Sequence, residues 1–107
     1  MSIKNLAAYR FVAIADPAVV AARVRALCEA GDIRGSVIVA PEGINLFLAG
    51  SPAAIDQVLA ALADDERFAG LTCKFSDSAT VPFRRLRVKL KREIIRFIDP
   101  ALAPATG

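Results

Sequence analysis

The stretch VIVAPEGINLFLAG, Val37 to Gly50, decides the fold. Two apolar runs flank the link PEGIN, which predicts two buried strands joined by a tight hairpin. Gly43 is expected to supply a positive backbone dihedral there, and Asn45 to bond the turn through its side chain. A phosphate-binding loop would need more glycines or a helix N-terminus. We therefore interpret the link as structural. The alternative is that Glu42 makes a polar contact with a partner domain or a ligand.

Two helices are predicted around this hairpin, and each begins with the same signal. Asp16–Pro17 and Ser51–Pro52 both place a capping side chain before a proline that suits the first helical turn. Gly31 can end the first helix, and the second runs to about Asp64. Apolar residues recur at helical spacing in both segments. They are Val20, Val24, Leu27 and Cys28 in the first, and Ile55, Val58, Leu59 and Leu62 in the second.

Three further segments read as strands. They are NLAAYRFVAI (Asn5–Ile14), LTCKFS (Leu71–Ser76) and the alternating FRRLRVKLKREIIRF (Phe83–Phe97). The order is strand, helix, strand, strand, helix, strand, with one additional C-terminal strand. This order predicts an α+β, ferredoxin-like βαββαβ sandwich with two helices on one face of an antiparallel sheet. We expect the domain to cover residues 1–98, and 99–107 to form a linker or tail.

Composition excludes several kinds of chemistry. The 107 residues contain no histidine, which removes Ser-His and Cys-His pairs and histidine metal sites. Cys28 and Cys73 form no CxxC motif, and we expect both to be unreactive. The run Asp64–Asp65–Glu66 is interpreted as a solvated helix end rather than a metal site. No apolar run has transmembrane length and no signal-peptide layout is present, so a cytoplasmic location is expected.

The net charge of +3 matters less than the position of the charges. Along the last predicted strand, cations alternate with apolar residues. The cationic side contains Arg85, Arg87, Lys89 and Lys91. Cations two residues apart on a strand are about 7 Å apart, close to the phosphate spacing of a single nucleic-acid strand. They would give salt-sensitive, sequence-independent binding to RNA. The alternative is an edge strand kept soluble by its cations.

Aromatic residues do not interleave with these cations in the sequence, and no RNP-type motif is present. We therefore expect contacts with the RNA backbone rather than with bases.

Three segments together resemble a known family. They are KNLAAYRFVAI (Lys4–Ile14), APEGIN followed by AGS, and VKLKREI (Val88–Ile94). They are similar to the N-terminal domain of the bacterial rhodanese-related proteins that act as tRNA wobble-uridine hydroxylases. The resemblance covers nearly the whole chain, to about Ile95. It implies an acylphosphatase-like fold, in agreement with the ferredoxin-like order. It also implies that the full-length relatives hydroxylate the wobble uridine of tRNA with oxygen as oxidant.

The chain departs from the family pattern in three ways. Leu46-Phe47 stands where small residues are usual after PEGIN, and Arg84 stands where a histidine often follows the PF pair. The catalytic cysteine of the family lies in a following rhodanese domain that is missing from these residues. Neither Cys28 nor Cys73 lies in a loop of that type, so the catalytic role cannot be assigned to either.

The resemblance thus implies a non-catalytic domain that needs no cofactor or metal. Its expected partners are tRNA, through Arg85, Arg87, Lys89 and Lys91, and the downstream rhodanese domain. Glu42 and Asn45 are candidates for that interdomain contact. Two other functions stay open: a dimeric ligand-binding or regulatory module, and an acylphosphatase-like hydrolase. The hydrolase is disfavoured because the loop AIADPA after the first strand carries an aspartate and no arginine.

Overall fold

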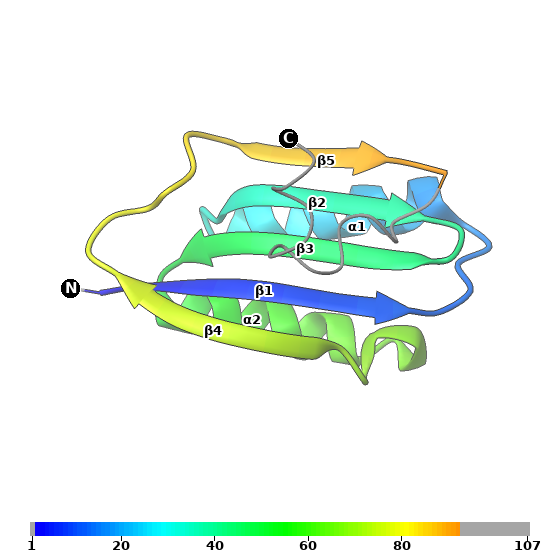
Figure 1. Ribbon diagram of the computed structural model, residues 1–107, viewed down its shortest axis with the longest axis horizontal. Helices are drawn as coiled ribbons and strands as arrows, with labels where there is room; N and C mark the ends of the chain where they lie inside the picture. The colour runs from blue at the N-terminus through cyan, green and yellow to red at the C-terminus, as the bar shows by residue number, and fades with distance from the viewer. Residues whose placement is uncertain (1, 93–107) are drawn as a thin grey trace, which may run out of the picture.

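A computed structural model describes residues 2–92, so the predicted tail and the residues after Arg92 lie outside the described part of the chain. The elements follow one another in a simple order (Figure 1). They are strand β1 (Ile3–Phe11), helix α1 (Pro17–Ala30), strands β2 (Arg34–Ala40) and β3 (Gly43–Gly50), helix α2 (Pro52–Ala63), the short 3₁₀ helix η1 (Glu66–Phe68), and strands β4 (Thr72–Ser78) and β5 (Leu86–Leu90). This order confirms the predicted α+β class.

The strands form one sheet in the order β4-β1-β3-β2-β5. The pairs β4–β1, β1–β3 and β3–β2 are antiparallel, which gives the four-stranded ferredoxin-like sheet. The additional strand β5 pairs with the outer side of β2 and runs parallel to it. Residues 79–85 connect β4 to β5 across the end of the sheet, because these two strands form its opposite edges (Figure 1).

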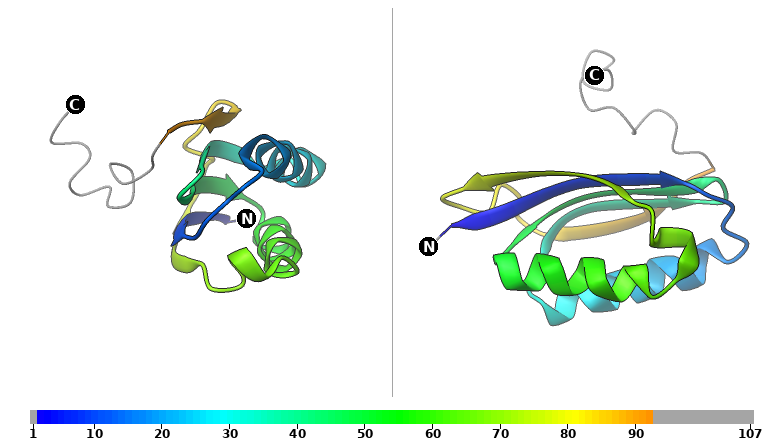
Figure 2. Two further views of the ribbon diagram at one scale, coloured as in Figure 1. Left: turned by 90° about the vertical axis from the view of Figure 1, so that its right-hand side faces the viewer. Right: turned by 90° about the horizontal axis from the view of Figure 1, so that it is seen from below.

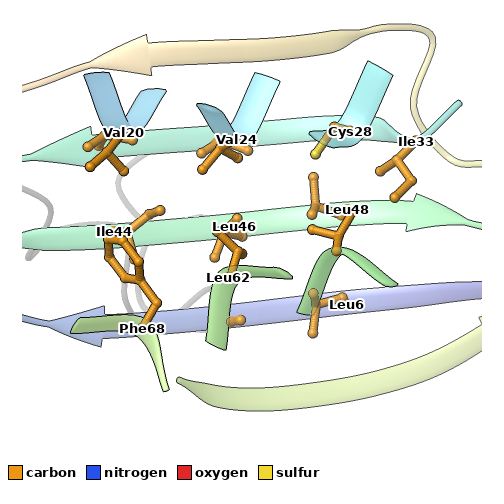
Figure 3. Packing of buried hydrophobic residues seen from close by; sticks show 14 of the residues in the cluster. Leu6, Val20, Val24, Cys28, Ile33, Ile44, Leu46, Leu48, Leu62 and Phe68 are labelled. Atoms are coloured by element: carbon orange, nitrogen blue, oxygen red, sulfur yellow. The ribbon is translucent and has the colours of Figure 1, made fainter. Parts of the chain in front are cut away.

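Both helices cover the same face of the sheet (Figure 2). We call the opposite face the open face. The core lies between the sheet and the helices, where Leu46 and Leu48 of β3 meet Val24 of α1 and Leu62 of α2 (Figure 3). The predicted apolar faces of both helices supply this core, and each of these four side chains is at most 1% exposed. Burial of this kind contributes about 25 cal/mol per Å² of apolar surface.

The link between the two central strands is a hairpin, as predicted. Ala40 pairs with Gly43, so Pro41 and Glu42 alone form the turn. The φ angle of Gly43 is +159°, positive but close to extended, because this residue already belongs to β3. Asn45 also lies within β3 rather than at the turn.

The two helix starts differ. The Ser51 hydroxyl accepts a hydrogen bond from the Ala54 N–H at 3.2 Å, as a capping residue does. Asp16 makes no such side-chain cap, although the sequence signal is the same. Its carboxylate instead accepts a hydrogen bond from Arg67 at 2.6 Å. The prediction that the Asp16 side chain caps α1 was therefore wrong, because an ion pair with a distant residue takes its place.

Candidate nucleic-acid interface

Strand β5 is held in place by backbone hydrogen bonds to β2. The Gly35 N–H donates to the Arg85 carbonyl at 3.1 Å, and the Lys91 N–H donates to the Val39 carbonyl at 3.0 Å. Between these two ends, Val37 pairs with Val88. The last strand therefore begins and ends within the stretch that the sequence alternation predicted.

The alternation separates β5 into an apolar and a cationic side. Leu86 and Val88 are half-buried and pack against the core, whereas Leu90 is 53% exposed near the end of the strand. All four predicted cations are exposed: Arg85, Arg87, Lys89 and Lys91. Because side chains alternate along a strand, these cations share one side, and that side belongs to the open face. We call them the cationic column.

A fifth cation lies beside this column. Gly35 pairs with Leu86, so the exposed Arg34 on β2 lies in register with Arg85. Sequence reasoning missed Arg34 because the apolar run that predicted this strand begins after it and was assigned only to the core. The pairing of β2 with β5, two elements far apart in the chain, was not visible in the sequence.

The two residues proposed for an interdomain contact lie in different surroundings. Glu42 is exposed at the tip of the hairpin, and its carbonyl accepts a hydrogen bond from the Val12 N–H at 3.1 Å. Asn45 is 1% exposed, on the side of β3 that belongs to the open face. The hairpin thus holds the loop after β1 through backbone contacts, with the Glu42 side chain directed to the outside of the domain.

An arginine that the sequence analysis did not single out lies beside that loop. Arg67 donates to Asp16 at 2.6 Å and to Asp65 at 2.8 Å, so one guanidinium joins the start of α1 to the segment after α2. The hydrogen bonds from Arg67 lower the pKa of the Asp65 carboxyl to about 2. The two carboxylates raise the pKa of Arg67. These groups line a groove of about 210 Å³ between the helices.

This groove bears on the hydrolase alternative. An acyl phosphate would need an arginine whose donors are available at the loop after β1. Arg67 does reach that loop, but its donors are already engaged by two carboxylates, Asp16 and Asp65. A phosphate would have to displace both. Arg67 therefore joins the two helical segments through two ion pairs. We call Arg67, Asp16 and Asp65 the clasp.

The cysteines have the surroundings of packing residues. Cys28 is fully buried in the core, and burial raises the pKa of its thiol to about 11. Cys73 is half-buried on β4, and burial raises its pKa as well. A reactive thiol needs a lowered pKa, so neither cysteine is suited to nucleophilic chemistry. Within residues 2–92, no group of three metal-ligating side chains could hold a metal ion.

The helices of the described segment are too short to cross a bilayer. The domain consists of two helices on a small sheet, with a cationic edge strand.

Comparison with known protein families identifies the domain further. The UPF0176 acylphosphatase-like domain family matches residues 3–94. The chain belongs to this family.

Two curated relatives illustrate the similarity. The tRNA uridine(34) hydroxylase of Bordetella avium is 50% identical over the whole chain, which spans 44% of that relative. The tRNA uridine(34) hydroxylase of Variovorax paradoxus is 53% identical over 98% of the chain, which spans 40% of it. The chain therefore corresponds to less than half the length of these relatives.

Solved structures with low sequence identity share the fold. The BLUF protein BlrB in its dark state aligns with a TM-score of 0.71 at 19% identity, over 97% of this chain and 83% of that chain. An acylphosphatase from Coxiella burnetii aligns with a TM-score of 0.57 at 13% identity, over 79% of this chain and 92% of that chain. Both confirm the ferredoxin-like, acylphosphatase-like arrangement.

Proposed function

We propose that this chain is the N-terminal domain of a tRNA uridine hydroxylase, that the chemistry belongs to a downstream rhodanese domain, and that strand β5 contacts the tRNA backbone. Relatives about 50% identical carry the hydroxylase name and are more than twice as long as the matched region.

The cationic column carries this proposal. Arg85, Arg87, Lys89 and Lys91 are all exposed at a sheet edge. The backbone ladder with β2 fixes their spacing at two residues, about 7 Å. Each cation that meets a phosphate releases counterions from the nucleic acid, so the affinity should fall steeply with salt. If these cations served only to prevent aggregation at the sheet edge, replacing them would not change the salt dependence of RNA binding.

The first test is tRNA binding by the 107-residue chain at several salt concentrations, followed by fluorescence anisotropy. The double variant Arg87→Glu/Lys89→Glu should weaken binding. It should also reduce the slope of log K against log salt by about 1.4 to 1.8, the contribution of two phosphate contacts. The matched control compares single variants: Arg87→Glu on β5 with Arg25→Glu, which makes the same charge reversal at an exposed position of α1. Equal effects of Arg87→Glu and Arg25→Glu would remove β5 from the proposal.

A second part of the proposal concerns the downstream domain. Glu42 at the hairpin tip would contact that domain and brace it against the sheet. Asn45, the other candidate from the sequence, is 1% exposed on β3, so we no longer propose it for this contact. Glu42 supports this by its exposure, and by the hydrogen bond that joins its backbone to the loop after β1. The intact mass of the native protein in its source cells tests whether such a domain exists. A mass near 11.4 kDa would contradict the hydroxylase assignment.

A further inference from the structure

The register of the strands defines which side chains share the open face. Residues directly opposite each other on paired strands point to the same side of a sheet. Leu6 and Ala8 point to the core, so Ala7, Tyr9 and Phe11 point to the open face. Two rows then cross the sheet from β4 to β5. They are Lys74, Ala7, Phe47, Ser36 and Arg87, followed by Thr72, Tyr9, Asn45, Ile38 and Lys89.

Three aromatic residues of β1 and β3 point to this face, although they lie far from β5 in the sequence. Phe11 is 50% exposed, and its ring lies 6.3 Å from the ring of Tyr9 in an edge-to-face arrangement. Ala7 pairs with Phe47, and Tyr9 pairs with Asn45, so Tyr9 and Phe47 are diagonal neighbours on adjacent strands. Tyr9 and Phe47 are both half-buried. We call Tyr9, Phe11 and Phe47 the aromatic patch.

The charges around the aromatic patch have one sign. Lys74 on β4 flanks it on one side, and the cationic column on β5 flanks it on the other. Among the described strand residues that point to the open face, none is an aspartate or a glutamate. Asp77 on β4 is in register with Lys4 and belongs to the helical side. The carboxylates Asp56 and Asp65 belong to the helical layer as well.

Aromatic rings and flanking cations together form the kind of surface that binds unpaired nucleotides. The rings accept bases by stacking, and the cations follow the phosphates. Strand β2 separates Phe47 from Arg87, which places their backbones about 10 Å apart. A long arginine side chain reaching inward covers part of this distance. Ser36 lies between Phe47 and Arg87, and the apolar residues Ile38 and Ala40 follow it on the same side of β2, where both are buried.

We propose that the open face binds unpaired RNA nucleotides, whose bases stack on the aromatic patch while the cationic column holds the backbone. This inference rests on the proposed function, because it takes β5 as the phosphate contact. It adds a selectivity that phosphate contacts alone do not give. Duplex regions of a tRNA keep their bases paired and stacked within the helix, so the open face favours loops and ends. A protein segment as the occupant would need carboxylates to match the cations.

The test compares an unpaired oligouridine with a duplex of equal length, each binding to the 107-residue chain. Phe47→Leu and Phe11→Leu should each weaken oligouridine binding by about tenfold, within the range for one lost base stack. The salt slope should stay unchanged, because no phosphate contact is lost. Tyr9→Phe keeps the ring and should bind as the unmodified chain does. The matched control is Phe75→Leu, since Phe75 is 51% exposed but in register with Leu6 on the helical side.

A second measurement needs no variant and so avoids any loss of folding. Photo-crosslinking of 5-iodouridine oligonucleotides to the unmodified chain should label Tyr9, Phe11 or Phe47. Labels confined to the helices, or equal affinity for duplex and unpaired RNA, would overturn the stacking proposal. If Phe47→Leu and Phe11→Leu bind normally while Arg87→Glu/Lys89→Glu loses salt dependence, the stacking proposal fails and the backbone contact stands. If none of these variants matters, both proposals fail.

Discussion

Gly35 is the position where the smallest substitution should cause the largest loss of stability. It is buried on β2, and its φ angle is +149°, a conformation that side chains other than glycine rarely adopt. A Cβ atom added there would lie 1.9 Å from the carbonyl oxygen of Phe47 and 2.9 Å from the Cα of Leu48. Both atoms belong to the backbone of the central strand β3. The clash therefore cannot be relieved by rotating a side chain.

The magnitude follows from two contributions. An unfavourable backbone conformation costs about 1–3 kcal/mol, and overpacking against a neighbouring strand costs about 1–3 kcal/mol. We expect Gly35→Ala to lower the free energy of unfolding by about 3 kcal/mol, a large part of the roughly 5–15 kcal/mol typical of a domain. Because the Gly35 N–H also bonds the Arg85 carbonyl, the pairing of β5 should weaken with it.

Urea unfolding followed by circular dichroism measures this loss, with Gly70→Ala as the control. A Cβ at the exposed Gly70 would meet the Nη1 atom of Arg10 at 2.7 Å, but that is the end of a flexible side chain. The control should change stability by less than about 1 kcal/mol. If Gly35→Ala and Gly70→Ala unfold at the same urea concentration, the close approach of β2 and β3 at this position is not real.

Three other predictions concern the core, the clasp and the thiols. Leu46→Ala should cost about 2–5 kcal/mol of unfolding free energy, because the side chain is fully buried; loss of less than about 1 kcal/mol would contradict the packing. The pKa of Asp65 is lowered from 3.8 to about 2 by Arg67, so its contribution to stability is present above about pH 4 and is lost as the pH falls towards 2. Acid unfolding curves of Asp65→Asn should lack that component, and identical curves would refute the assignment. A thiol reagent at pH 8 should leave Cys28 unlabelled in the native protein and label it only on unfolding, whereas Cys73 should react first. Fast labelling of Cys28 in the native protein would be inconsistent with its burial.

The elements with local signals were predictable from the sequence, and the features formed by distant residues were not. The Ser51 cap follows from residues within one helical turn, and the structure confirms it. Asp16 carries the same local signal, but Arg67 lies far along the chain and takes its carboxylate. The cationic column was visible as an alternation within one segment. Its neighbours Tyr9 and Phe47 were not, because the order β4-β1-β3-β2-β5 brings together strands that are not consecutive.

The connection from β4 to β5 needs a minimum number of residues. These strands are the two edges of the sheet, so residues 79–85 must span four inter-strand spacings, about 19 Å, and a further offset along the strands. The fully extended backbone from Ser78 to Leu86 reaches about 26–29 Å at most. Removing two residues would shorten this reach to about 20–22 Å, which leaves nothing for the offset, so the connection can lose about one residue before β5 is pulled out of register with β2. Insertions cost little by comparison, because loop closure depends only weakly on length. The position of the cationic column thus depends on how long this loop is.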